Sequence, residues 1–180
     1  MTPVSTIPHF AEALLAEAPE APALVLRRAG ARDRVWCRAA VEHRAVGIAG
    51  FCVAQGLRAN AAVLITAVGP LDVMAAVWFV LATGRRLGGL PDAAFALDDA
   101  AFQRARADRA DYTLCTTVGP ADPALAEPAG WSHERLMGAV LNEEPIPLRP
   151  LVARALRALV RPEPWIIEGA NLGRLAISAA

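Results

Sequence analysis

The longest apolar stretch of the chain, AAVLITAVGPLDVMAAVWFVLATG at residues 61–84, constrains the fold more than any other segment. A Gly-Pro pair and Asp72 interrupt it, and each uninterrupted piece is shorter than the ~20 residues that a membrane-spanning helix needs. Residues 61–68 have the length and composition of a strand covered on both faces. Residues 72–81 are apolar nearly all round, as in a deeply buried helix. The stretch therefore predicts a strand, a turn and a helix inside a folded domain, with no membrane span.

Weaker patterns on either side of this stretch alternate between helix and strand. Helical spacing or helix-favouring composition occurs in five further segments, residues 10–19, 39–55, 98–111, 133–141 and 151–161. Strand-like segments are residues 22–30, 33–39, 112–117 and part of 163–180. The first two strands flank a short turn around Gly30 and should pair as a hairpin. The alternation predicts an α/β fold, a layered parallel or mixed sheet with helices on both faces.

The domain organisation follows from the positions of these elements. The 180 residues suit one domain with a substantial core. We expect residues 1–142 to form the main α/β domain. The segment EEPIPLRP at residues 143–150 is typical of a Pro-rich linker. The amphipathic helix and C-terminal strand that complete residues 143–180 should pack on the same domain.

The charged residues exclude several kinds of chemistry. All eighteen basic residues are arginine, and they balance eighteen acidic residues to a formal net charge of zero. This balance argues against nucleic acid as a partner, because phosphate binding depends on excess positive charge. The absence of lysine excludes Schiff-base chemistry and the lysine of a phosphate-binding loop.

Cysteine and histidine usage indicates neither a metal site nor a secreted protein. Cys37, Cys52 and Cys115 are odd in number, far apart and without a CxxC motif, so we expect reduced structural thiols. Reduced thiols are typical of the cytoplasm. The N-terminus lacks the positive region and apolar run of a signal peptide, so we expect a cytoplasmic protein. The three histidines are scattered and predict no metal site.

Five consecutive segments carry a family resemblance. They are a helix like FAEALLAEAPEAPALV, a strand pair, a helix like AAVEHRAVGIAGFCVAQGL, the run NAAVLITAVGPLDVMAAVWFVLATG and a turn like RRLGGLP. In this order, residues 8–90 resemble the beginning of an adenylate-forming synthetase, the family of AMP-forming acyl- and aryl-CoA ligases and peptide-synthetase adenylation domains. The next segment, AFQRARADRADYTLCTT, resembles the following unit of that domain. The resemblance implies the α/β fold of the N-terminal subdomain of these ligases.

The same resemblance exposes a missing segment. In the family, a Ser/Thr/Gly-rich loop with a lysine wraps the phosphates of ATP and precedes a Ser-His pair that opens a helix. Here DPAL (122–125) and SHERL (132–136) resemble the two flanks, and only AEPAGW (126–131) lies between them. A rival alignment places the loop at residues 112–120, which also lack lysine and lie too far from the Ser-His pair. We favour a deletion of the phosphate loop.

The resemblance fades beyond residue 141. The ribose-binding acid, the substrate-pocket helix and the catalytic lysine of the family therefore have no counterpart here. We expect no catalytic, cofactor-binding or metal-binding residues and no cofactor.

The remaining polar residues suggest structural roles. Ser132 and His133 are adjacent at a helix start and point apart, so we expect a cap and a first-turn residue rather than a catalytic dyad. Glu143 and Glu144 lie in the Pro-rich linker, where solvation is expected. The segment GANLG, residues 169–173, is typical of a terminal turn.

Three functional hypotheses remain open. The first is an AMP-ligase-like protein that does not catalyse and acts as a partner-binding or accessory subunit in an acyl or aryl activation pathway. It predicts a protein partner or self-association. The second is one chain of a split acyl- or aryl-adenylating ligase. The third is a binder of an acyl or aryl small molecule without turnover. On its own, the chain is not expected to be an enzyme.

Overall fold

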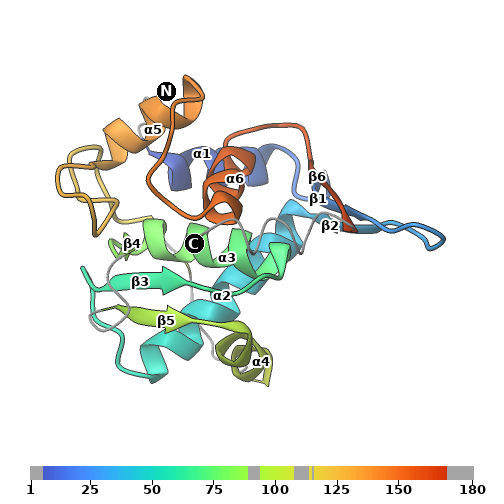
Figure 1. Ribbon diagram of the computed structural model, residues 1–180, viewed down its shortest axis with the longest axis horizontal. Coiled ribbons are helices and arrows are strands. Elements are labelled where there is room, and N and C mark those ends of the chain that lie inside the picture. Colours follow the sequence, from blue (N-terminus) through green and yellow to red (C-terminus); the bar gives the residue numbers. More distant parts are fainter. Residues whose placement is uncertain (1–5, 89–93, 108–113, 115, 170–180) are drawn as a thin grey trace.

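The structure is a computed structural model that describes residues 6–88, 94–107, 114 and 116–169. Figure 1 shows the arrangement of its elements. The helices are α1 (Ile7–Glu17), α2 (Arg38–Ala54), α3 (Pro70–Ala82), α4 (Asp99–Ala107), α5 (His133–Leu141) and α6 (Pro150–Leu159). The strands are β1 (Pro22–Arg27), β2 (Arg34–Cys37), β3 (Ala62–Ile65), β4 (Arg86–Leu87), β5 (Phe95–Leu97) and β6 (Trp165–Glu168). The expected α/β class is confirmed, although the strands form two small sheets.

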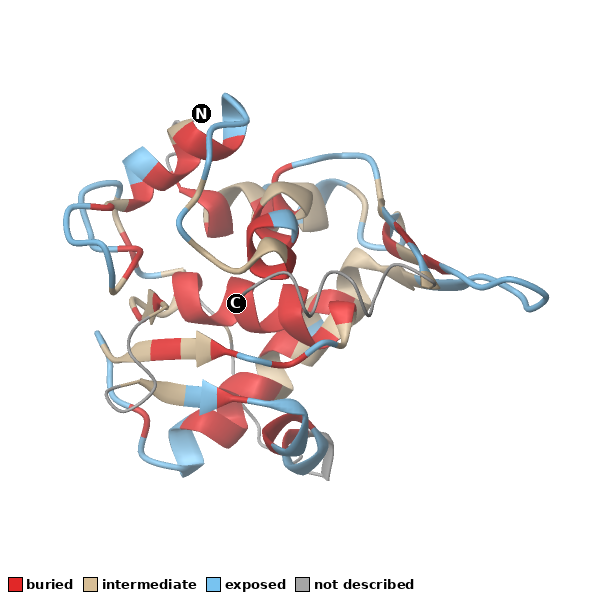
Figure 2. Cartoon of the chain, viewed as in Figure 1, coloured by how far each residue is buried: buried red, intermediate tan, exposed pale blue. Residues whose placement is uncertain are grey.

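Helix α3 forms the centre of the molecule. It begins at Pro70, whose fixed φ suits the first helical position, and every residue except Leu71 is buried. Helices α1, α2 and α6 pack around α3, and Figure 2 shows the buried residues concentrated there. The prediction of a buried helix is confirmed, since a helix that is apolar all round needs neighbours on every side.

Strand β3 is the middle strand of an all-parallel sheet with the order β4-β3-β5. Val63 of β3 lies opposite Leu87 of β4 and Phe95 of β5. Leu125 adds a single parallel bridge to Leu87, which extends the sheet on the side of β4. Helix α3 contacts β3 and β4, and α4 contacts β5. This sheet positions the candidate site described below.

The second sheet has the order β2-β1-β6 and lies at one end of the molecule (Figure 1). Strands β1 and β2 form the predicted antiparallel hairpin, and β6 pairs in parallel with β1. One face is closed by a small cluster in which Leu24, Leu26 and Ile167 are buried. The C-terminal strand thus returns to the N-terminal hairpin.

A buried ion pair joins α2 to α3. The Nε of Arg44 lies 2.6 Å from Oδ1 of Asp72, and the two side chains are 11% and 8% exposed. The Nη2 of Arg44 also donates to the carbonyl oxygen of Phe102 in α4, at 2.8 Å. Asp72 stands in the first turn of α3, where the sequence places it. The pairing with Arg44 connects three helices through one guanidinium.

Two expectations about strands need correction. The sequence places a strand covered on both faces at residues 61–68, but β3 is shorter, and only Val63 and Ile65 within it are buried. Leu64 is partly exposed because it lines a groove. Strand β5 was not expected, since three residues are too few to show a period.

Half of the expected strand at 112–117, namely Tyr112, Thr113 and Cys115, lies outside the described residues. The described residues of this segment are not part of a strand. Within the described part of the chain, no helix has the length and apolar character needed to cross a membrane.

Replacing Asp72 with Ala should leave the Arg44 guanidinium buried without its carboxylate. We expect a loss of about 3 kcal/mol in the free energy of unfolding, measured by urea denaturation. The exposed ion pair between Arg161 and Glu143 provides the control, and Arg161→Ala should cost less than about 1 kcal/mol. Equal losses for the two variants would contradict a structural role for the buried pair.

Candidate functional site

The segment between the two family-like flanks is a closed turn. Leu125 and Ala124 both donate their backbone N–H to the carbonyl oxygen of Trp131, at 3.4 and 2.8 Å. Pro123 and Ser132 form an antiparallel bridge, and Gly130 takes a positive φ of 87° that favours glycine. The strand-like lead-in and the helix start therefore pair with each other across residues 126–131, and Ala126 also donates its N–H to the carbonyl oxygen of Leu87 in β4 at 2.8 Å.

The first three backbone N–H groups of α5 donate hydrogen bonds to acceptors within the chain. His133 donates its N–H to the carbonyl oxygen of Asp122 at 3.0 Å, and Glu134 donates to that of Pro120 at 2.8 Å. The N–H of Arg135 donates to the hydroxyl of Ser132 at 3.2 Å, which confirms the predicted N-cap. A helix N-terminus binds an anion through amides of this kind. These three are already satisfied within the protein.

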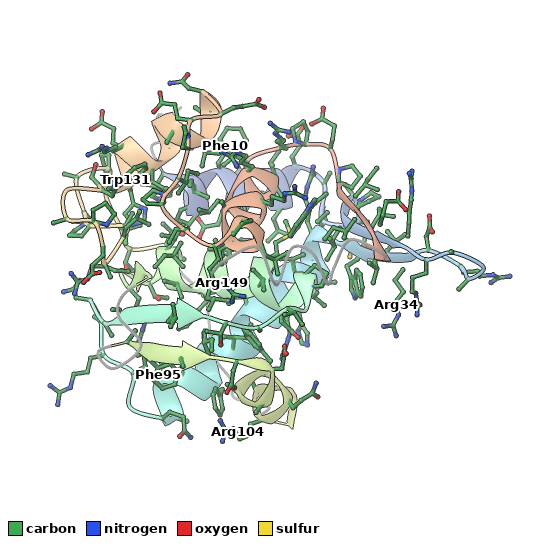
Figure 3. The ribbon with its side chains drawn as sticks, viewed as in Figure 1. Phe10, Arg34, Phe95, Arg104, Trp131 and Arg149 are labelled. Carbon is green, nitrogen blue, oxygen red and sulfur yellow. The ribbon has the colours of Figure 1, made fainter. Side chains whose placement is uncertain are left out.

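An aromatic contact covers the same turn. The guanidinium carbon of Arg135 lies 4.6 Å from the centre of the buried Trp131 ring, within the range of a cation–π interaction. Figure 3 shows Trp131 beside α5. Arg135, in the first turn of α5, thus stacks on the last residue of the 126–131 turn.

His133 belongs to the core below this turn. Its side chain is 1% exposed, and neither ring nitrogen has a hydrogen-bond partner among the described residues. Burial lowers the pKa of His133 to about 4, against a smaller opposing effect of Asp122. The imidazole is therefore neutral near pH 7. The sequence did not indicate this burial, because the residue opens a helix beside two charged neighbours.

A groove of about 530 Å³ adjoins the turn at the carboxyl ends of β3 and β4. It is lined by Val63, Leu64, Ile65, Leu87, Gly88, Glu127, Pro147, Leu148, Arg149, Pro150 and Val152. Ligands of open parallel sheets commonly bind beyond the carboxyl ends of the strands. This position makes the groove the candidate ligand site of the described structure.

The groove has an apolar wall and two charged residues. Arg149 lies between the start of α6 and β3 (Figure 3), and its Nη1 donates to the carbonyl oxygen of Ile65 at 2.9 Å. Glu127 comes from the closed turn and places a carboxylate on the lining. A triphosphate needs several positive charges or free amides. One arginine and one glutamate do not supply this excess, whereas the aliphatic wall suits an apolar group.

Comparison with known proteins identifies the fold. No family model matches the chain, and no curated protein matches it. Among solved structures, the adenylation and carrier-protein structure of McyG with phenylalanyl-adenylate matches with a TM-score of 0.70 and 12% identity, over 94% of this chain and 37% of that one. The chain has the fold of the N-terminal part of an adenylate-forming ligase.

Two further structures support the same fold. The N-terminal subdomain of NpsA from Klebsiella oxytoca matches with a TM-score of 0.62 and 13% identity, over 91% of this chain and 54% of that one. A fatty acyl-adenylate ligase from L. pneumophila matches with a TM-score of 0.64 and 11% identity, over 91% and 39%. The ligase-like chain thus spans about two fifths to one half of the lengths of these proteins. The family resemblance of the sequence is confirmed at the level of the fold.

The other candidate residues have structural surroundings. Glu143 pairs with Arg161 at 2.5 Å in the exposed linker. The hydroxyl of Thr116, from the rival loop alignment, donates to Glu12 of α1. Gly169 approaches the carbonyl oxygen of Arg27, and the rest of the 169–173 segment lies outside the described residues. None of these groups lines the groove.

The cysteines and acidic residues do not gather into a metal centre in the described part of the ligase-like fold. Cys37 and Cys52 are free thiols, and Cys115 lies outside the described residues. Burial raises the pKa of Cys52 to about 12, so this group remains a thiol near neutral pH. Cys52 lies on the buried face of α2 and packs in the hydrophobic core, which is a structural role.

His133 should make the fold sensitive to acid. Because its folded pKa of about 4 lies below the unfolded value near 6.5, the unfolded chain binds the proton first. Stability should therefore fall as the pH is lowered through 6.5 towards 4, by about 3 kcal/mol in total. His133→Leu should flatten this dependence in urea titrations at pH 7.5, 6 and 5.

The exposed His43 serves as the matched control, and His43→Leu should keep the acid sensitivity. If His133→Leu and the unmodified protein lose stability equally between pH 7.5 and 5, the buried neutral imidazole is not its source.

Proposed function

We propose that this chain does not adenylate carboxylates by itself and that it acts, in the cytoplasm, as a partner-binding protein of an acyl or aryl activation pathway. The observation that carries the proposal is the closed start of α5. The amides of His133, Glu134 and Arg135 already have acceptors in the chain, and no lysine exists to offset a phosphate charge. A phosphate cradle depends on free backbone amides, and the family resemblance implies a lysine beside them.

The partner-binding part of the proposal draws on the matched structures. McyG and the fused NpsA–ThdA protein combine an adenylation domain with a carrier-protein domain. Binding of such a neighbour to this fold would not require a phosphate cradle. The free thiols Cys37 and Cys52 agree with a reducing compartment.

The isolated protein should neither bind MgATP in calorimetry nor exchange pyrophosphate into ATP with fatty or aryl acids. A competent adenylation domain assayed in parallel provides the positive control. Stoichiometric MgATP binding together with carboxylate-dependent exchange would contradict the proposal. Exchange that needs a second polypeptide would instead support the split-ligase hypothesis.

A second candidate function is the binding of a carboxylic acid without turnover. The groove favours it, because an aliphatic wall formed by Leu64, Leu148 and Val152 lies beside the Arg149 guanidinium. An apolar tail would occupy the wall, and a carboxylate would lie towards the arginine. This ligand class requires no phosphate cradle.

A saturating apolar acid should raise the melting temperature by about 5 °C if the groove binds it. Leu64→Trp fills the groove and should abolish the shift. Leu141 is an exposed leucine of α5 outside the groove, so Leu141→Trp should retain the shift. If fatty acids, aryl acids and AMP all leave the melting temperature unchanged, this second function is ruled out.

A further inference from the structure

The hairpin between β1 and β2 concentrates positive charge. Residues 27–34, RRAGARDR, hold four arginines and one aspartate in a chain of zero formal net charge. Every residue from 27 to 35 is exposed. Figures 1 and 2 show this hairpin extending from the body of the molecule, away from β3 and β4. It is thus a basic arm on an otherwise balanced protein.

Most of this charge has no counterpart among the described residues. Arg27 lies 4.0 Å from Asp33 and 3.4 Å from Glu168, so the local carboxylates gather around one arginine. No ion pair of Arg28, Arg32 or Arg34 occurs within the part of the chain that the structure describes. Figure 3 shows Arg34 near the base of the arm. Three guanidinium groups therefore face solvent.

An apolar row crosses the sheet at the base of the arm. Val25 pairs with Val35 of β2 and with Ile166 of β6, so the three side chains lie in register across the strands. Val35 is 55% exposed and Ile166 is 47% exposed. Exposed aliphatic residues in a continuous row on a charged arm are a common feature of interaction surfaces.

A recess lies at the base of the arm. It measures about 450 Å³ and is lined by Arg34, Val35, Trp36, Arg44 and Leu71. Arg44 is neutralised by Asp72, so Arg34 supplies the unpaired charge of the lining. A recess with an aromatic wall and an arginine rim can hold one large side chain next to a carboxylate.

We propose that this basic arm, residues 27–36 with Val25 and Ile166, binds an acidic protein segment that carries a large apolar side chain. The inference rests on the proposed function as a partner-binding protein and names the surface and the chemistry of the partner. Carboxylates of the segment pair with Arg28, Arg32 and Arg34, because guanidinium groups bind carboxylates in a bidentate manner. The apolar side chain occupies the row or the recess.

A protein fits these features better than a polyanion does. Nucleic acid offers phosphates to the arginines but no aliphatic group to the row of Val25, Val35 and Ile166. The zero net charge of the chain also gives no long-range attraction to DNA. Complementarity of charge and of apolar surface together favours an acidic, amphipathic protein segment.

A fluorescent synthetic helix with Glu on one face and Leu and Phe on the other is the probe, and anisotropy reports its binding to the full chain. Affinity should fall with added NaCl. The triple variant R28Q/R32Q/R34Q should weaken binding about tenfold. Arg58, Arg104 and Arg135 are exposed on the segment after α2, on α4 and on α5, so R58Q/R104Q/R135Q makes the same charge change away from the arm and should alter affinity less than about twofold. Circular dichroism verifies that both variants are folded.

Equal weakening by the two triple variants would overturn the inference, as would tighter binding of a DNA duplex or of phosphatidylglycerol vesicles through the same three arginines. A pathway protein that binds the unmodified chain and R28Q/R32Q/R34Q equally would also overturn it while leaving the proposed function intact. MgATP turnover by the isolated chain would overturn the proposed function and leave the peptide result unaffected.

Discussion

A helix that opens at the end of a parallel strand offers unpaired amides, and what satisfies those amides determines what such a fold can bind. Here Asp122, Pro120 and Ser132 accept the hydrogen bonds of the first turn of α5. The chain thereby stabilises the helix start without an anion. The closed turn, the stacking of Arg135 on Trp131 and the burial of His133 all occur at this helix start.

The core of the fold is centred on α3. Helix α3 is buried on all sides by α1, α2 and α6, and the pair of Arg44 and Asp72 connects it to α2. The ligase-like scaffold therefore keeps its core while the region beyond β3 and β4 becomes an apolar groove with one arginine and one glutamate. Neither Arg44 nor Asp72 lines this groove, so the ion pair of the core and the candidate ligand site reside in different parts of the fold.

Local spacing predicted the features that depend on neighbours in sequence. The buried α3, the hairpin and the Ser132 cap follow from composition and capping chemistry over a few residues. The partner of Asp72 lies 28 residues away in sequence, and the burial of His133 depends on the packing of other segments against it. Strand β5 forms because β3 offers it a pairing edge, which no three-residue pattern reveals. The groove arises where a later segment, residues 147–152, reaches β3.

Hydrogen exchange measured by NMR at the amides of His133, Glu134 and Arg135 addresses the closed helix start directly. If the chain supplies the acceptors, these amides exchange slowly in the free protein, and saturating MgATP leaves their rates unchanged. Rapid exchange in the free protein that becomes slow when MgATP is added would show a functioning phosphate cradle and would contradict the account.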